Sequence, residues 1–400
     1  MHNIFNLFVS TEVLSLRIPV AGLAVKVMYP LQVLLMVVLF IKLLQYRYAF
    51  INKKDSTSLA VWLWLLLLAV CIPLITSNPE ARTINYTLVL LSWVLLFFMV
   101  GRTLRVDLRS FLNVYCFSIF FLLSISLVSF LFISDERIDS IFGGGTNRLG
   151  LYSVIGMLIS MYILNKNIPI KFRDIYKIGL PICVIAFVLT FSRTALLALG
   201  VAALEHTIRT KRIKLGHLAL IAAIVTVIVF YLNHMFVSTG DERFLKLMHR
   251  FRIAEFLGHT YAADFDEVSR AIHYQNALGL ITSSWSSLMF GLGLESYRSV
   301  DFLSNLRGKD LALHSMYLQY FMGGGILALG CLLIFIGTLY VRILSLPQWQ
   351  KDILLFMFVP AIVHAAFQPA IFSREILLYA PLLLLSCQLG QKLEKEHPAP

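Results

Sequence analysis

Long runs of apolar residues, separated by short polar links, make up most of the chain. Runs such as 59–70, 114–133 and 218–232 hold no charged side chain. Inside a lipid bilayer only α-helices and closed β-barrels satisfy every backbone hydrogen bond, and a barrel would alternate apolar and polar residues over strands of about ten residues. The runs do not alternate, so the pattern predicts membrane-spanning α-helices.

The apolar runs predict eleven spans, each near the length of about 20 residues with which a helix crosses a bilayer. They are residues 29–46, 58–75, 84–100, 111–132, 149–165, 178–191, 194–208, 217–233, 314–341, 353–371 and 376–390. A weaker hydrophobic stretch at 4–25 would make twelve. The two short spans, 178–191 and 194–208, meet in a tight turn at Ser192 and Arg193. The expected fold class is therefore all-α, a polytopic membrane protein with about twelve transmembrane helices.

Lysine and arginine are unevenly divided between the two alternating sets of links, with eighteen in one set and six in the other. Basic links stay on the cytoplasmic side of a membrane, so the richer set is predicted to be cytoplasmic. These counts cover the short links only; the other set then faces outward, and so does a large loop with eight further basic residues. The chain accordingly divides into three regions: N-terminal transmembrane helices at 1–233, a periplasmic loop at 234–313, and three spans with a short cytoplasmic tail at 314–400.

Composition agrees with this picture, because 58% of the residues are hydrophobic, only 14% are charged, and the mean hydropathy is +0.80. A soluble enzyme is excluded by the low charge content, and a single-span receptor by the number of apolar runs. The net charge of +12 would suggest nucleic acid in a soluble protein. Here membrane topology accounts for it, so membrane lipids are expected as partners and nucleic acid is not. The five cysteines all lie in apolar runs, which favours packing residues over disulfides or metal ligands.

Four ionisable residues are predicted to lie at or beside the outer membrane face: Arg193, Arg270, His314 and Arg374. Charged groups at this depth are costly and usually need a partner. Arg193 lies between two short spans, in the run 191–194 (FSRT), without an acidic neighbour in the sequence. One interpretation is a guanidinium fork that binds phosphate oxygens, and the other is an interfacial arginine that reaches out to water. The short paired helices favour the anion clamp.

Arg270 lies in a stretch of the large loop that is predicted to be helical over Val268–Ser283. Either Arg270 adds a second cation to a pyrophosphate site, or it pairs with Asp266 or Glu267 on the preceding turn. The acidic run 264–267 (DFDE) could hold a divalent ion against a diphosphate. A helix cap, with acids at the positive end of the helix dipole, is the favoured interpretation, so no metal site is expected.

His314 opens the span at 314–341. A neutral imidazole at the outer mouth of a helix can accept a proton from a sugar hydroxyl, as a general base in glycosyl transfer does. The alternative is a boundary histidine that is hydrogen-bonded to the loop. The glycines at 323–325 would let helices approach closely, and the run 291–293 (GLG) is interpreted as a turn. The outward run 143–148 (GGGTNR) ends at Arg148, for which an anion contact is a hypothesis.

The order of these motifs resembles the O-antigen ligase and O-antigen polymerase superfamily. The similar parts are the run 191–199 (FSRTALLAL), the run 290–293 (FGLG) late in the loop, and His314-Ser315 with Gly325 eleven residues after the histidine. Arg148, after its glycine run, also looks similar to ligases. Ala328 departs from the family, which often has a second glycine there, and this difference affects helix packing and not catalysis.

The resemblance implies a C-type, inverting and metal-independent glycosyltransferase of the bacterial inner membrane, without a cofactor and with its active site facing the periplasm. The donor would be a glycan on undecaprenyl pyrophosphate, and the acceptor the lipid A core oligosaccharide of lipopolysaccharide. By the same resemblance, Arg193 and Arg270 would hold the pyrophosphate and His314 would activate the acceptor hydroxyl. Arg148, Arg374 and Ser315 are further candidates for substrate binding.

Two other functions stay open at this point. A polymerase would use a second lipid-linked repeat as the acceptor, but polymerases more often have two large outward loops, and here there is one. A flippase or transporter would grip the same lipid pyrophosphate, and transporters place charged groups near the middle of the bilayer. Such groups are scarce in this chain, where His364 is the main polar residue deep in a late span. The ligase is therefore the favoured prediction.

Overall fold

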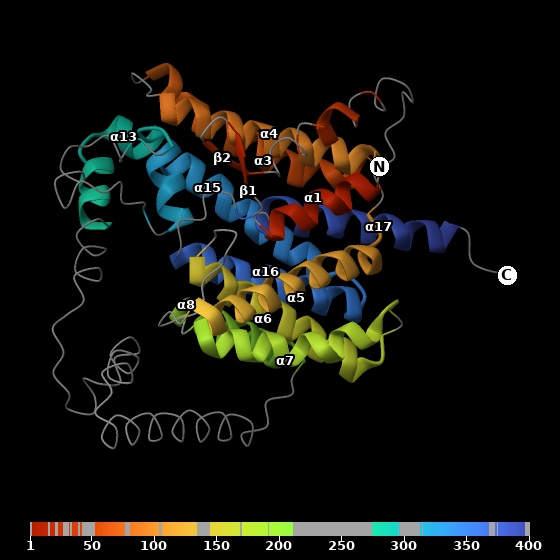
Figure 1. Cartoon of the computed structure of the whole chain (residues 1–400). Coiled ribbons are helices and arrows are strands. Elements are labelled where there is room, and N and C mark those ends of the chain that lie inside the picture. The colour runs from red at the N-terminus through yellow and green to blue at the C-terminus, as the bar shows by residue number, and fades with distance from the viewer. Residues whose placement is uncertain are drawn as a thin grey trace.

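The computed structural model describes residues 2–14, 17–20, 23–26, 32, 34–38, 41, 53–76, 81–103, 106–133, 145–168, 170–190, 192–210, 274–294, 296, 313, 315–367, 373 and 375–396. Helices dominate these residues, as the apolar pattern predicted. They lie side by side, with the short helix α13 (Trp285–Phe290) at one end of the assembly and the end of the last helix, α17 (Ala380–Glu396), at the other (Figure 1).

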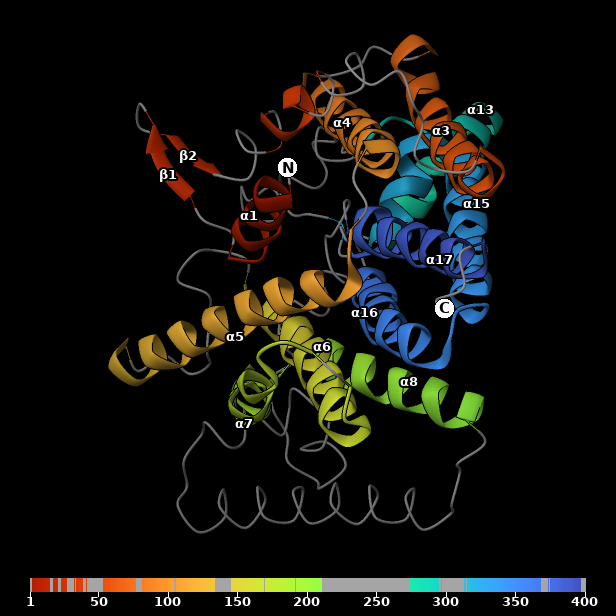
Figure 2. The same cartoon turned by 90° about the vertical axis from the view of Figure 1, so that its right-hand side faces the viewer.

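One group of helices is formed by α3 (Lys53–Thr76), α4 (Ala81–Thr103) and α15 (Met316–Leu344). α3 packs along α15 and also contacts α4. The last helix, α17 (Ala380–Glu396), packs against this group and reaches across to α16 (Figure 2).

The second group holds α5 (Leu108–Ile133), α6 (Gly145–Lys166), α7 (Arg173–Thr190), α8 (Arg193–Thr210) and α16 (Gln348–Phe367). α6 packs against both α7 and α8, and α8 packs against α16 (Figure 2). The predicted pair of short helices is confirmed, because α7 ends at Thr190 and α8 begins at Arg193. The candidate site lies in this group.

Residues 4–25, left open as a weaker twelfth span, do not form one continuous helix. The helix α1 (His2–Leu14) is only 13 residues long, and a two-stranded antiparallel hairpin follows it, with β1 (Arg17–Val20) paired to β2 (Leu23–Lys26). Pro19 lies inside β1, where its ring and missing N–H prevent a helix from continuing. The all-α fold class is confirmed, with one small hairpin beside the helices.

Five helices of the described residues are long and apolar enough to cross a membrane: Leu59–Thr76, Leu108–Leu131, Thr146–Lys166, Met316–Leu344 and Gln348–Phe367. Several helices also keep large apolar side chains on the outside, such as Phe117 on α5, Ile178 on α7 and Leu204 on α8. In water such a surface would be unfavourable, whereas lipid covers it without cost. The chain is a helical membrane protein. The span predicted at 217–233 and the start of the large loop lie outside the described residues.

The last predicted span, 376–390, begins with a π-helical turn, η2 (Glu375–Tyr379), before it continues as α17. Pro381 explains this irregular start, because it has no N–H to donate to a carbonyl one turn earlier. Helices accommodate such a lost bond by local π-type widening. All five residues of η2 are buried, including the charged Glu375.

Candidate functional site

The turn between α7 and α8 is held by Ser192. Its hydroxyl oxygen accepts a hydrogen bond from the backbone N–H of Ala195 at 3.2 Å, and its carbonyl accepts from Leu196 at 3.0 Å. Ser192 is therefore the N-cap of α8, a position at which serine is favoured. Arg193 is the first residue of the helix and its side chain is exposed. The cap fixes the direction in which the chain presents Arg193.

The Ser192 hydroxyl also joins α8 to α6, because it donates to Asn147 Oδ1 at 3.0 Å. Gly150, one turn into α6, makes this approach possible: a Cβ atom there would lie only 2.8 Å from the Ala195 Cβ and 3.0 Å from the Ser192 Cβ. The N-termini of two helices thus meet at one place. Each contributes a positive dipole end and N–H groups, which favour a bound anion.

α16 reaches the same place with its C-terminal end. The buried His364 donates from Nε2 to the carbonyl oxygen of Asn147 at 3.2 Å. The Tyr317 hydroxyl, in the first turn of α15, donates to the carbonyl of Ile362 at 3.3 Å. These two bonds connect the start of α15 to the end of α16, and the end of α16 to the N-terminus of α6. Residues predicted to face outward in separate links are therefore neighbours in space.

Arg148 belongs to this cluster. Its guanidinium donates to the Tyr152 hydroxyl from Nε at 3.1 Å and from Nη2 at 2.7 Å, and it lies over the same ring, 5.2 Å from the centroid. Tyr152 is buried and packs edge-on against Tyr115, with the ring centroids 6.3 Å apart. The hydroxyl of Tyr152 thus helps to position Arg148 at the N-terminal end of α6.

Glu375 is a buried carboxylate that the sequence reasoning missed. Its Oε1 accepts from the Tyr115 hydroxyl at 3.3 Å and its Oε2 from the Ser373 hydroxyl at 3.3 Å, and only 5% of the residue is exposed. The signal was a single acid at the start of an apolar run, directly after Arg374. A charged residue buried inside a span marks a functional position by default, so Glu375 joins the candidate residues.

The two glycine motifs that were interpreted as a turn and as helix packing contact each other directly. Leu292 N–H donates to the Met322 carbonyl at 2.7 Å, and Gly293 N–H to the Gly323 carbonyl at 3.2 Å. α15 is kinked where they meet, with a φ of +67° at Gly325. A Cβ at Gly325 would lie 2.3 Å from the backbone of Met289. Only glycine fits this position. The close contact that glycine allows holds the end of the large loop against the kink in α15.

A small apolar cluster connects the loop to the start of α15. Residues 274–281 are helical, in agreement with the second half of the helix predicted over 268–283. Ala277 and Ile281 on this helix pack with Leu313 and Met322. Leu313 directly precedes His314 in the sequence, so the loop helix lies against the segment that carries the predicted base.

The structure describes some of the predicted site residues and not others. Arg148 and Arg193 lie on the helix ends that the Ser192–Asn147 bond joins. Ser315 is the N-cap of α15, where its hydroxyl accepts from Leu318 N–H at 3.3 Å; its contact with substrate is still a prediction. Arg270, His314 and Arg374 lie outside the described residues, as does the acidic run 264–267. Among the described residues the five cysteines are free thiols, as expected for packing residues.

Two comparisons with known proteins add to this picture. Residues 178–333 match the family model described as O-antigen ligase. This segment begins in α7 and ends in α15, so it includes the Ser192–Arg193 turn, the large loop and the glycine contact. No curated protein matched the chain.

Proposed function

Because residues 178–333 of this chain form a domain of the O-antigen ligase family, we propose that the protein is an O-antigen ligase of the inner membrane. It moves a glycan from undecaprenyl pyrophosphate to the lipid A core oligosaccharide, with the reacting groups on the periplasmic face. The enzyme inverts the configuration at the anomeric carbon and needs no metal ion. Arg193, Arg270 and His314 are the residues that carry the reaction.

The observation that carries this proposal is a series of three hydrogen bonds that joins four helix ends. Tyr317 follows His314 by three residues in the sequence and is bonded to α16 through Ile362. α16 is bonded to Asn147 through His364, and Asn147 is bonded to Ser192, the neighbour of Arg193. The segments that carry the proposed base and the proposed anion clamp therefore lie in one part of the protein, although more than 100 residues of sequence separate them.

The position of Arg270 is supported by helical periodicity. If the helix predicted over 268–283 extends back to Arg270, this residue shares a face with Tyr274, Ala277 and Ile281, because they follow it by four, seven and eleven positions. Ala277 and Ile281 pack against Leu313. The guanidinium of Arg270 would then lie beside His314, which is the arrangement that a donor bridging two arginines requires.

The proposed reaction follows from these positions. The acceptor hydroxyl oxygen attacks the anomeric carbon while the bond from that carbon to the pyrophosphate oxygen breaks. His314 takes the proton of the hydroxyl, and the leaving undecaprenyl pyrophosphate gains the negative charge. Arg193 and Arg270 bind its oxygens in bidentate fashion, and fixed cations with nearby helix N-termini stabilise charge that develops in the transition state. Arg148, Arg374 and Ser315 complete the substrate contacts.

The first test replaces each of the three residues in the purified enzyme. We expect Arg193→Ala, Arg270→Ala and His314→Ala to abolish transfer from a lipid-linked glycan to lipid A core while the protein still inserts and folds. Arg193→Lys should fail as well, because an ammonium group cannot reproduce the guanidinium fork. Tyr340→Phe serves as a matched control at the other end of α15, where it removes a hydroxyl bonded to Glu205, and it should retain most activity. Full activity of His314→Ala would contradict the mechanism.

The second test identifies the acceptor and the need for metal. The enzyme is mixed with the lipid-linked glycan and either lipid A core or a second portion of lipid-linked glycan. A ligase extends only the core, whereas extension of the lipid-linked glycan would identify a polymerase, and movement of the donor across vesicles without a new glycosidic bond would identify a flippase. Chelation of metal ions with EDTA should leave the rate of glycan transfer unchanged. A loss of transfer in the presence of EDTA would contradict the metal-independent reaction.

A further inference from the structure

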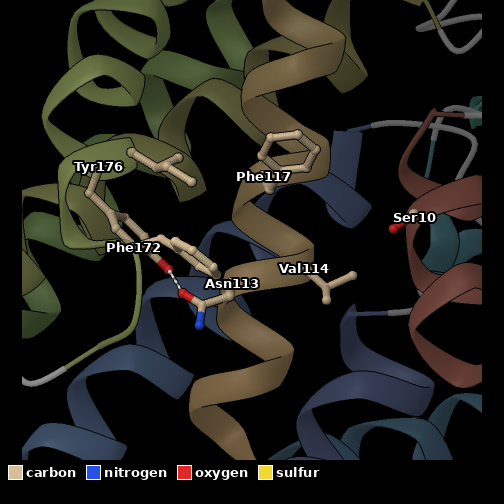
Figure 3. A pocket seen from close by; sticks show the side chains of 7 residues that line it. Ser10, Asn113, Val114, Phe117, Phe172 and Tyr176 are labelled. Carbon is tan, nitrogen blue, oxygen red and sulfur yellow. Dashed lines mark hydrogen bonds between the residues drawn. The ribbon is translucent and has the colours of Figure 1, made fainter. Parts of the chain in front are cut away.

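A cavity lies between α1, α5 and the start of α7, the end of α7 opposite to the Ser192–Arg193 turn. It has a volume of about 390 Å³, in the range of small-ligand sites. Figure 3 shows Asn113, Val114 and Phe117 on α5, Phe172 and Tyr176 at the beginning of α7, and Ser10 on α1 across the opening. Apart from Ser10, Asn113 and Tyr176, the lining side chains are hydrocarbon.

The polar side chains of this wall are engaged with protein groups. The Tyr176 hydroxyl donates to Asn113 Oδ1 at 3.4 Å, as the dashed line in Figure 3 marks. The Ser118 hydroxyl donates to that of Ser10 at 3.0 Å. A polar ligand would have to break these bonds, whereas a hydrocarbon chain would leave them intact. The cavity therefore suits an apolar occupant.

The turn between α6 and α7 forms the rim of the cavity and holds Phe172 in an unfavourable backbone conformation. Its φ is +66°, which is rare for a bulky residue. The turn is fixed by the buried side chains of Ile168 and Ile170, and by Arg173, which donates to the Leu164 carbonyl at 3.0 Å. Strain that the surroundings enforce marks positions with a function. The strained turn between α6 and α7 keeps the Phe172 side chain 59% exposed at the edge of the cavity.

The charge at the rim selects one class of occupant. The link 166–177 contains four basic residues and one acid, Asp174. Asp174 is bound by Lys177 at 2.7 Å, while the ammonium group of Lys171 lies over the Phe172 ring, 5.1 Å from its centroid. Lys171 is thus placed directly above an apolar cavity and is not engaged with that carboxylate. A negatively charged headgroup above a hydrocarbon chain complements this arrangement.

We propose that the cavity binds one anionic phospholipid of the leaflet on this basic face, with an acyl chain between Val114, Phe117 and Phe172 and its phosphate at Lys171. Phe117 is 54% exposed and Ile178 is 66% exposed, so the chain continues from the cavity along apolar surface that already faces the membrane. The site is separate from the proposed transfer reaction and does not depend on it.

The test measures lipid binding to the purified protein in detergent by native mass spectrometry. Phosphatidylglycerol is compared with phosphatidylcholine of the same acyl chains. We expect phosphatidylglycerol to bind more tightly, and Lys171→Gln to weaken its binding about fivefold, the value for one lysine near an anionic surface. Lys177→Gln is the matched control, because it removes the same charge from the same basic segment. The affinity of this variant for phosphatidylglycerol should stay within about twofold of the parent, because the Lys177 ammonium of the parent is already bound to Asp174.

A second variant tests the position of the acyl chain. Val114→Trp fills the cavity and should abolish binding of phosphatidylglycerol; if this variant does not fold, Val114→Phe replaces it. Circular dichroism and size-exclusion chromatography verify folding before the measurement. Equal binding of the two lipids, equal losses in the two lysine variants, or undiminished binding in the folded Val114 variant would each overturn the proposal.

Discussion

The helices α6, α8 and α16 are joined to one another at both ends, but by different chemistry. At the end that carries the candidate site the joints are neutral hydrogen bonds, from Ser192 to the side chain of Asn147 and from His364 to its carbonyl. At the opposite end the joint is ionic. Arg209 on α8 contacts Asp352 on α16 at 2.6 Å and Glu205 on its own helix at 2.8 Å.

The ionic end is organised around Asp352, which is only 1% exposed. Gln348 donates to both of its carboxylate oxygens at 3.0 Å, and His206 Nδ1 lies 3.7 Å from it. The groups surround a small cavity of about 260 Å³. Since the charge of Arg209 is met by two carboxylates, this end has a structural purpose: it locks α8 to α16.

The difference between the two ends separates a structural arginine from a functional one. Arg209 is neutralised by the buried Asp352 and the half-buried Glu205, so an incoming anion would gain little there. Arg148 is positioned by the neutral hydroxyl of Tyr152, and Arg193 begins a helix whose dipole adds to its own charge. The ionic end holds α8 to α16, and we propose that the other end binds a polyanionic ligand.

The largest expected effect comes from breaking the ionic end. Asp352→Asn leaves the half-buried guanidinium of Arg209 with one carboxylate fewer, and breaking a buried ion pair costs up to about 3–5 kcal/mol. The free energy of unfolding, measured in mixed micelles, should fall by this amount. Activity per folded molecule should change little, because the substituted group lies at the far end of the helices from the candidate site.

Asp174→Asn is the matched control, since it makes the same chemical change in an exposed ion pair with Lys177. Exposed pairs contribute little because water and salt screen them, so unfolding of this variant should be indistinguishable from that of the parent. If Asp352→Asn also abolished glycan transfer in the folded protein, the two ends would not be functionally distinct.

A smaller effect is expected at the neutral end when the helices are pushed apart. Gly150→Ala places a Cβ atom 2.8 Å from that of Ala195, and overpacking of this kind costs about 1–3 kcal/mol. The displacement also separates Asn147 from Ser192, so transfer activity should fall together with stability. Gly200→Ala is the control on α8, because its Cβ meets no atom within 4 Å. This variant should gain about 0.5–1 kcal/mol from helix propensity, with unchanged activity.

The sequence predicted the helical architecture well, because lipid imposes long apolar segments on any spanning helix. The pair α7 and α8 was found with its turn at Ser192, and the ends of most other helices fall within a few residues of the prediction. The hairpin at Arg17–Lys26 was missed because hydropathy alone does not distinguish a short strand pair from a helix, although Pro19 was a signal against the helix.

The candidate site was predictable only in part. Arg148 and Arg193 could be placed on one face by the distribution of positive charge, which reports topology. The hydrogen bonds through Asn147 could not be predicted, because they depend on how three helices pack and Asn147 has no distinctive neighbours in the sequence. Glu375 and the contact between the glycine motifs were missed for the same reason: a long-range contact leaves no local pattern.

Ser192→Ala is expected to give the smallest change in stability. It should also separate the effect on stability most sharply from the effect on activity. This substitution removes the N-cap of α8, which typically costs about 1 kcal/mol, and also the bond to Asn147. Arg193 directly follows, and a displacement of about 1 Å in a catalytic geometry can lower the rate about a hundredfold. We therefore expect transfer to fall far more than the stability change alone would produce, as measured by steady-state kinetics beside unfolding in mixed micelles.

Ser345→Ala is the control. It removes a hydroxyl bonded to the Arg342 carbonyl at the ionic end of the bundle, and it should change neither the rate of transfer nor the free energy of unfolding appreciably. Equal rates for the two serine variants would mean that the position of Arg193 does not control the reaction.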